Sequence, residues 1–383
     1  MNYLDVDIYR EFKCIADACP NTCCVGWEVF IDKNTYKKMA EKEEQLGIPA
    51  KEWLKDNGEI VSVRLDHERC PMLADNNLCN VVMKLGPEYL SSVCTIYPRA
   101  YASYGDTIER HLQISCPEVI MKLMEKHTIE FDACHDQSPA PEYPYTQLYL
   151  FECDVRAFII GIIQDMPQIT LNTRLFTAYT ILEEGIRMYQ ENQLDSGKLE
   201  KEVSFYAGES VLRNVETQLT QIVNGSSQYR FAEQLLKIAD SYNQRYVRLF
   251  RLVRQAMAYF EEHDIGQYMS DVQEFKKACL DTYPDFYTNY WVYRIFADTL
   301  SVPDYEKSKE KFSYIAIEFA LFQTIAMAAF AKRGSLDHEE YIYIISTISR
   351  ILEHTENFRN VLMNEIHEKK LASAAGILLM ALI

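Results

Sequence analysis

The chain has no excess of basic residues, and this absence limits the functions open to it. It carries 39 lysines and arginines against 56 aspartates and glutamates, which gives a formal net charge of −17. Because such a surface would repel the phosphates of a nucleic acid, we expect no nucleic-acid partner. An acidic surface suits a basic or lysine-bearing partner, and it also serves solubility alone.

Two further signals are missing. The first residues, Met1 to Asp5, contain neither a basic stretch nor an apolar segment of the kind that opens a secretory signal. The longest apolar run, 371–383, is shorter than the roughly 20 residues that cross a bilayer as a helix. We therefore expect a cytoplasmic protein without membrane insertion. In that reducing compartment, its eleven cysteines are not expected to form a disulfide framework.

Two familiar nucleotide-binding loops are also absent. None of the thirteen glycines belongs to a G-x-G sequence, so a Rossmann-type loop has no support. The C-x3-C-x2-C signature of radical-SAM enzymes is not present either. Cys19 and Cys23 match its first step, but the third position is Gly26. If the protein uses a nucleoside cofactor, neither of these two loops binds it.

Cysteine, by contrast, is concentrated in the first third of the chain. Cys134, Cys153 and Cys279 are scattered through the rest. Four thiolates satisfy either a tetrahedral zinc ion or a four-iron cluster. The spacing is irregular and lacks the paired knuckles of zinc sites, which favours a [4Fe-4S] cluster, with zinc as the alternative. We expect about four ligands among eight candidates: Cys14, Cys19, Cys23, Cys24, Cys70, Cys79, Cys94 and Cys116.

The hydrophobic pattern predicts an α+β fold that is mostly α. Alternating apolar residues over 25–32, 60–65 and 108–114 predict the strands of a short antiparallel sheet, and a helix is expected over 86–97. We predict that 1–137 form a small cysteine-rich metal-binding domain, separated by the proline-rich segment 138–144 from an irregular helical bundle over 145–383.

Two apolar stripes in that second part have helical period. One runs over 231–260, and the other over 312–330, where Gly334 is expected to stop the helix. Such aromatic stripes could line a ligand groove, but a buried core is the favoured interpretation.

These residues carry a resemblance to a known family. The quoted elements are Phe12-Lys13-Cys14, Cys19, Cys23-Cys24, Gly26-Trp27-Glu28-Val29, Cys70-Pro71, Leu78-Cys79, Cys94, Tyr97-Pro98-Arg99, Ser115-Cys116-Pro117-Glu118 and Arg350-Ile351-Leu352-Glu353-His354. The cysteine pattern resembles the cysteine-rich zinc- or iron-chelating domain family, and the extended pattern resembles flagellin lysine N-methylase, the FliB family. One departure is Pro20-Asn21-Thr22, which is longer than the usual step before the adjacent pair.

The resemblance implies a methyltransferase that moves a methyl group from S-adenosylmethionine to lysine side chains of flagellin, with a four-iron cluster in the protein. Catalytic residues are not assigned. Tyr97 and Arg99 follow the cysteine helix and are candidates for contact with cluster or cofactor; a helix-end hydrogen bond and a surface ion pair are the alternative. The polar group of Arg350, Glu353 and His354 is predicted to form an interior salt bridge.

A second hypothesis comes from a different class. The missing nucleotide loops also suit a non-catalytic metal-binding scaffold or sensor with a helical partner-binding domain. A tightly held zinc ion would favour that hypothesis, and bound iron would favour the methyltransferase.

Overall fold

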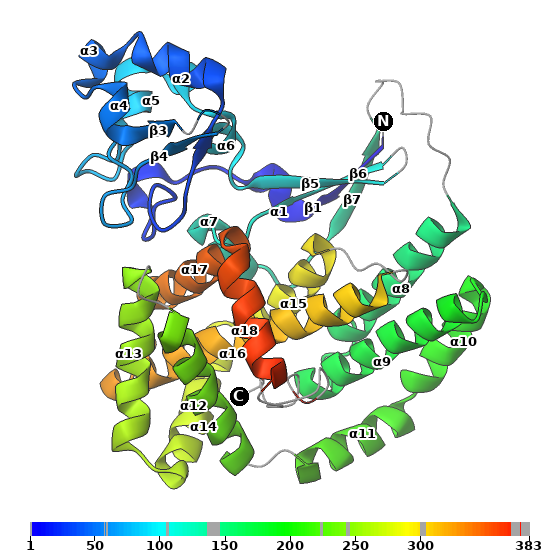
Figure 1. The fold of residues 1–383 in the computed structure, drawn as a ribbon. Coiled ribbons are helices and arrows are strands. Elements are labelled where there is room, and N and C mark those ends of the chain that lie inside the picture. Colours follow the sequence, from blue (N-terminus) through cyan, green and yellow to red (C-terminus); the bar gives the residue numbers. More distant parts are fainter. Residues whose placement is uncertain are drawn as a thin grey trace.

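The protein was analysed as a computed structural model. The structure describes residues 2–368, apart from 57, 59, 105–106, 136–145, 223–224, 243–245 and 299–303, together with residue 376. The fold is mostly helical, with small sheets confined to the N-terminal third, as the sequence predicted (Figure 1). The proline-rich segment 138–144 and the apolar run 371–383 lie outside the described residues, apart from residue 376. The predicted domain boundary therefore stays a prediction.

Two sheets are present among the described residues. The larger has the order β5-β6-β1-β7, in which β1 pairs in parallel with β6 and antiparallel with β7. The smaller has the order β2-β4-β3 and is antiparallel throughout. The three expected strands therefore do not form a single sheet: those near 30 and 62 belong to the antiparallel sheet, whereas the strand over 107–112 belongs to the mixed one. The strands are β1 (Asn2–Val6), β2 (Phe30–Ile31), β3 (Leu54–Asp56), β4 (Val61–Val63), β5 (Arg99–Tyr104), β6 (Thr107–Leu112) and β7 (Phe131–His135).

The helices of the N-terminal third are short. The prediction of one continuous helix over 86–97 was wrong. Gly86 has φ of 102° and Leu90 is extended, so the chain is not helical at either residue. The Ser91 hydroxyl then accepts from Cys94 N and caps a separate helix. The elements are α1 (Asp7–Glu11), η1 (Ala16–Ala18), α2 (Lys33–Ala40), α3 (Glu43–Leu46), α4 (Ala50–Trp53), α5 (Asn80–Leu85), η2 (Pro87–Tyr89), α6 (Ser92–Ile96) and α7 (Pro117–Glu125).

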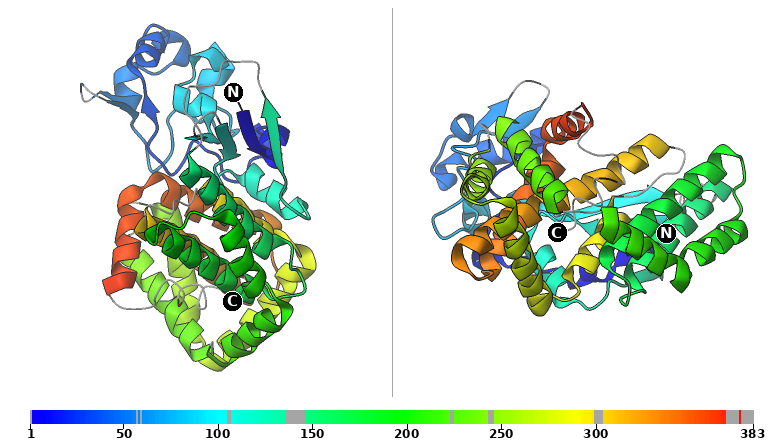
Figure 2. Two further views of the ribbon diagram at one scale, coloured as in Figure 1. Left: turned by 90° about the vertical axis from the view of Figure 1, so that its right-hand side faces the viewer. Right: turned by 90° about the horizontal axis from the view of Figure 1, so that it is seen from below.

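The helices beyond residue 146 are longer and enclose a common core (Figure 2). Gly334, with φ of 70°, ends α16 as predicted. The stripe over 231–260 is divided between two helices rather than lying on one. The helices are α8 (Gln147–Gln164), α9 (Leu171–Gln190), α10 (Ser196–Tyr206), α11 (Glu209–Ile222), α12 (Gly225–Tyr242), α13 (Val247–Glu262), α14 (Ile265–Thr282), α15 (Phe286–Ala297), α16 (Tyr305–Arg333), α17 (His338–His354) and α18 (Glu356–Glu368).

One described helix, over Lys307–Arg333 in α16, has the length and mean hydropathy of a membrane span. Its most apolar window is 89% buried inside the protein. A helix that is apolar on all sides is typical of the centre of a folded core, and here the other helices cover it. The aromatic side chains of this stripe, including Phe312 and Phe319, are buried in the same core, so the core interpretation is confirmed.

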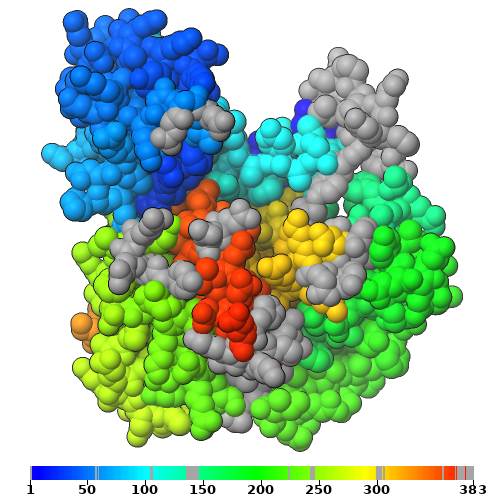
Figure 3. Space-filling model, in the orientation of Figure 1, coloured from blue at the N-terminus to red at the C-terminus, as the bar shows by residue number. Residues whose placement is uncertain are grey.

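Two separate hydrophobic cores divide the molecule. A small one lies within residues 14–96, which we call the cysteine-rich lobe; Trp53, Val61 and Val81 belong to it. The large one joins the helices to β1, β6 and α7, and we call this part the main body. The lobe projects from one end of the main body (Figures 1 and 3).

Candidate metal centre and its contact with the helices

Cys24 and Cys70 are brought together by backbone pairing. Cys70 N donates to Cys24 O at 2.9 Å, and Gly26 N donates to Glu68 O at 2.9 Å. Gly26 has φ of 89°, which a residue with a side chain rarely adopts. The turn after the adjacent cysteine pair therefore depends on glycine. It places the first cysteine segment alongside the segment that leads into Cys70.

Cys79 and Cys94 each lie at the start of a short helix. Cys79 is the residue before α5, and an isolated bridge pairs it with Leu73 across the turn that begins at Cys70. Cys94 lies in the first turn of α6, behind the Ser91 cap. The lobe thus presents single thiols from three separate segments of the chain, which local spacing could not reveal.

Five thiols interact electrostatically with one another: Cys23, Cys24, Cys70, Cys79 and Cys94. Desolvation, together with the other thiolates of this group, raises the pKa of Cys70 to about 12 and that of Cys94 to about 11. The hydrogen bond between Cys23 and Cys24 lowers the pKa of Cys23 and raises that of Cys24. Ionising Cys70 and Cys94 at neutral pH therefore requires a compensating cation.

The remaining three candidates lie beside this group. Cys19 interacts with Cys14 and Cys23, and Cys116 interacts with Cys19 and Cys23. Cys116 is buried in the main body, where desolvation raises its pKa to about 12. Cys14 is exposed. Cys23 is the member that connects the two sets.

The geometry and the chemistry of the thiols bear differently on a bound metal. Within the described residues, no three or more His, Cys, Asp or Glu side chains are arranged so that they could hold a metal ion. The five thiols are thus neighbours rather than a formed coordination shell. Their chemistry nevertheless fits: all are soft sulfur donors, and a bound cation would remove the mutual repulsion of their thiolates. Which of the eight candidate cysteines would be ligands stays a prediction.

Arg350 joins the helices to the cysteine-rich lobe. This buried guanidinium donates to backbone carbonyls of Asn21 (2.9 Å), Thr22 (2.9 Å) and Val25 (3.1 Å), and to Ser115 O (3.1 Å). The predicted interior salt bridge was wrong, because these carbonyls, rather than a carboxylate, accept from Arg350. A planar guanidinium can satisfy several acceptors at once, which makes it suited to holding a loop that has no regular structure.

Asn21 is the partner of this contact in the loop between Cys19 and Cys23. Its side chain is buried and donates to the hydroxyls of Ser346 (2.8 Å) and Thr347 (3.1 Å) on α17. Its side-chain amide oxygen, Oδ1, accepts from Arg248 (2.9 Å) and Arg350 (3.1 Å). Neither Asn21 nor Arg248 was a predicted site residue. The only signal for Asn21 in the sequence was the longer step Pro20-Asn21-Thr22 before the adjacent cysteine pair.

Three rings meet next to Arg350. The Trp27 ring stacks on the His354 ring with centroids 4.3 Å apart, and Tyr97 lies 5.4 Å from Trp27. Trp27 Nε1 donates to Cys23 O at 2.7 Å. Ser115 lies within hydrogen-bonding distance of both Tyr97 (3.2 Å) and His354 (3.3 Å). The family element on α17 thus contacts the segments that carry Cys23 and Cys116.

Glu353 completes this junction. It accepts from Ile114 N (3.3 Å) and Ser115 N (3.1 Å), and burial raises its pKa to about 7. Desolvation, with a smaller contribution from Arg350, lowers the pKa of His354 to about 4, so this imidazole is neutral at pH 7.

The two predicted cofactor contacts have separate positions. Tyr97 lies among the junction rings and interacts electrostatically with Cys23 and Cys116. Arg99 is exposed, with its guanidinium 5.1 Å from the centre of the Phe12 ring. The structure therefore brings Tyr97 towards the thiols and gives Arg99 an aromatic partner. Whether either contacts a cofactor stays a prediction.

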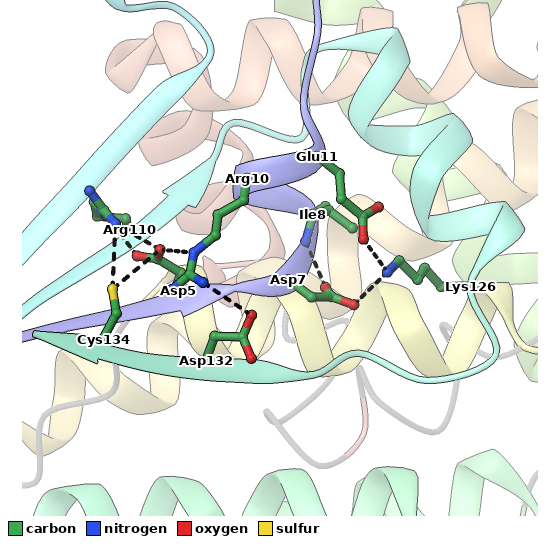
Figure 4. A network of polar contacts seen from close by, with 9 residues as sticks. All are labelled: Asp5, Asp7, Ile8, Arg10, Glu11, Arg110, Lys126, Asp132 and Cys134. Atoms are coloured by element: carbon green, nitrogen blue, oxygen red, sulfur yellow. Dashed lines mark hydrogen bonds and ion pairs between the residues drawn. The ribbon is translucent and has the colours of Figure 1, made fainter.

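Cys134 belongs to a different network, shown in Figure 4. Buried Asp5 accepts from Arg110 (2.6 and 2.7 Å) and from Arg10 (2.8 Å), and Cys134 lies at the edge of this group. Hydrogen bonds from both arginines outweigh the desolvation of the Asp5 carboxyl and lower its pKa. The network fixes β1 between its neighbours, and it is not part of the candidate metal centre.

Comparisons with known proteins show one family match and several relatives. Residues 156–380 match a family described as FliB lysine N-methylase C-terminal domain. Over 121 residues the chain is 32% identical to the lysine-N-methylase of Salmonella typhimurium. The aligned region covers 30% of this chain and 30% of that protein. The chain is also 32% identical over 121 residues to the flagellar biosynthetic protein FliU of Salmonella muenchen, 30% of this chain and 72% of that protein.

The match thus spans about 30% of the length of the curated lysine-N-methylase. No solved structure matches this chain.

Proposed function

The chain belongs to the FliB lysine N-methylase family, and on that premise we propose that it is a protein-lysine N-methyltransferase of the cytoplasm. Its methyl donor is S-adenosylmethionine, its substrate is flagellin, and it holds a [4Fe-4S] cluster. The printed name of the Salmonella muenchen relative, a flagellar biosynthetic protein, supports a flagellin-related substrate. The acidic surface of this chain suits a lysine-bearing partner.

One observation carries the proposal. The family region of α17 is anchored through Arg350 to the cysteine segment: two of its four carbonyl acceptors, those of Asn21 and Thr22, lie in the loop between Cys19 and Cys23. The other two belong to Val25 and Ser115. A metal module attached by a linker would not need this buried contact. The cysteine-rich lobe and the family's helical domain are therefore built to work as one unit.

The cluster would be held by four of the five interacting thiols, Cys23, Cys24, Cys70, Cys79 and Cys94. A bound iron–sulfur cluster supplies a redox-active centre whose properties depend on the charges around it. Arg350 would place a positive charge beside Cys19 and Cys23, and Trp27, stacked on His354, would hold the backbone of Cys23 through its hydrogen bond to Cys23 O.

The transfer itself is a group-transfer step with a simple balance. The bond between the sulfonium sulfur and its methyl group breaks, and a bond from that methyl to the lysine nitrogen forms. The products are S-adenosylhomocysteine and N-methyl-lysine, and the amine gives up one proton. The reaction requires a neutral amine held in line with the methyl group and screened from water.

The test is an assay of the full chain purified without oxygen. Iron and acid-labile sulfide are measured first, and the protein is then incubated with flagellin and S-adenosylmethionine. Mass spectrometry should find flagellin lysines heavier by whole methyl groups, only when the methyl donor is present. Iron-loaded protein that transfers no methyl group to flagellin would contradict the proposal. Tightly bound zinc with no affinity for S-adenosylmethionine would instead support the metal scaffold.

A further inference from the structure

A cavity of about 510 Å³ lies where the cysteine-rich lobe meets α13 and α17. Its size falls in the range of small-molecule binding sites, roughly 300 to 1,000 Å³. The residues that decide its chemistry are Cys19, Glu68, Arg69, Arg248, Arg251 and Tyr343. Cys19 places the cavity beside the candidate metal centre.

The cavity is positively charged although the chain as a whole is strongly negative. Three arginines line it against one carboxylate, that of Glu68. Desolvation lowers the pKa of Arg248, and the nearby charges of Arg350 and Arg69 also lower it, whereas Tyr343 and Glu68 raise it. Arg251 lines the cavity and is exposed. A lysine side chain would be repelled here, so this cavity does not receive the methyl acceptor.

Glu68 places a second requirement on any ligand of this cavity. Its Oε2 accepts from Arg248 N at 3.3 Å, while its Oε1 is buried and has no hydrogen-bond partner within the described residues. A buried acceptor of this kind normally has a donor. An inorganic anion would neutralise the arginines but would be repelled by Glu68. A zwitterion with adjacent negative and positive groups satisfies both at once.

We infer that this cavity binds the amino-acid end of S-adenosylmethionine. The α-carboxylate lies between Arg248 and Arg251, and the α-ammonium donates to Glu68 Oε1. This assignment rests on the proposed function, because it locates the methyl donor of that reaction. It places the donor beside Cys19, at the contact between the cysteine-rich lobe and the helices.

Calorimetry on the full, metal-loaded chain tests the assignment. The probes are S-adenosylhomocysteine, which keeps the amino-acid end, and 5′-methylthioadenosine, which lacks it. Arg251→Gln is the variant, because Arg251 is exposed and its removal leaves the folded core intact. Arg254→Gln is the matched control: Arg254 lies on the same helix outside the cavity, and its side chain, paired with Asp240, is 56% exposed.

The variant Arg251→Gln should weaken S-adenosylhomocysteine binding about tenfold or more, because it removes a charge-assisted hydrogen bond to a carboxylate. Binding of 5′-methylthioadenosine should not change, and Arg254→Gln should bind both probes as the wild type does. Unchanged affinity of Arg251→Gln for S-adenosylhomocysteine would overturn the assignment, and so would an equal loss for both probes.

The methyl-transfer assay separates the two proposals. If the wild type methylates flagellin while Arg251→Gln keeps its full affinity for S-adenosylhomocysteine, only the location is wrong. If the wild type neither binds S-adenosylhomocysteine nor transfers a methyl group, the proposed function and the location both fail.

Discussion

The cysteine-rich lobe and the main body reach a stable fold by different means. The main body buries long apolar helices around α16, whose central residues are almost completely inaccessible. The lobe has two-to-three-residue strands, short helices and a small separate core. A core of that size stabilises a fold only marginally, and small domains of this kind commonly depend on a metal or on contacts with a neighbour. The lobe has both resources: a group of thiols and the Arg350 anchor.

Loss of the metal should have the largest effect on this comparison. Cys70→Ser removes one of the five interacting thiols, and we expect it to lower bound iron severalfold and to unfold the lobe locally. Hydrogen exchange should then show lost protection in 25–93 and unchanged protection in α16. Cys153→Ser, outside the thiol group on α8, is the control and should keep its iron. Equal loss of protection in both regions would mean that they form a single folding unit.

Removal of the Arg350 anchor should have the second largest effect. Arg350→Gln deletes a buried guanidinium that donates to four backbone carbonyls, and we expect a loss of about 3 kcal/mol or more in the free energy of unfolding. Denaturation in urea should then change from one transition to two, with the lobe unfolding first. Exposed Arg187→Gln on α9 should leave the midpoint nearly unchanged. A single transition with an unaltered midpoint would remove Arg350 from this role.

A smaller change tests the turn at Gly26, which lies inside the cysteine-rich lobe beside Arg350. Gly26→Ala introduces a side chain at φ of 89°, with the new Cβ 3.6 Å from Arg350 Cδ, so the cost is in the backbone rather than in a clash. We expect the free energy of unfolding to fall by about 1–2 kcal/mol. Gly334→Ala, at φ of 70° with open space around it, should cost a similar amount. Only Gly26→Ala should also lower metal content, and the same metal content in both variants would contradict the proposed importance of this turn.

The smallest effect concerns pH. Burial lowers the pKa of His111 from 6.5 to about 4, so the folded state binds its proton less readily than the unfolded state. Its contribution to stability is therefore present above pH 6.5 and is lost as the pH falls towards 4. The charged residues near it are Arg294, Asp298, Glu353 and Arg359, which line the same cavity.

When the pH falls from 7.5 to 5.5, the free energy of unfolding of the wild type should fall by about 1 kcal/mol more than that of His111→Gln. Urea denaturation at the two pH values measures this difference, in which the titration of Glu353 largely cancels. A difference that does not change with pH would show that His111 is not desolvated in the folded protein.

Periodicity in the sequence was sufficient for α16 of the main body, although it did not reveal the break between α12 and α13. The apolar stripe over 312–330 and the stop at Gly334 predicted α16 because a helix that is buried on all sides needs apolar residues at every turn. The secondary structure of the cysteine-rich lobe was harder to predict. The helix over 86–97 was predicted as continuous, whereas Gly86 and the Ser91 cap divide it. In short elements, one capping side chain outweighs the hydrophobic pattern.

The sequence by itself determined that thiols are concentrated near the N-terminus and that Arg350, Glu353 and His354 lie within one turn of a helix. Only the tertiary structure decided which of them meet. Cys24 faces Cys70 because of backbone pairing across more than forty intervening residues, and Arg350 reaches Asn21 from a separation of 329 residues. Spacing along the chain carries no information on such contacts, because loops of irregular structure can close at almost any length for a small entropic cost.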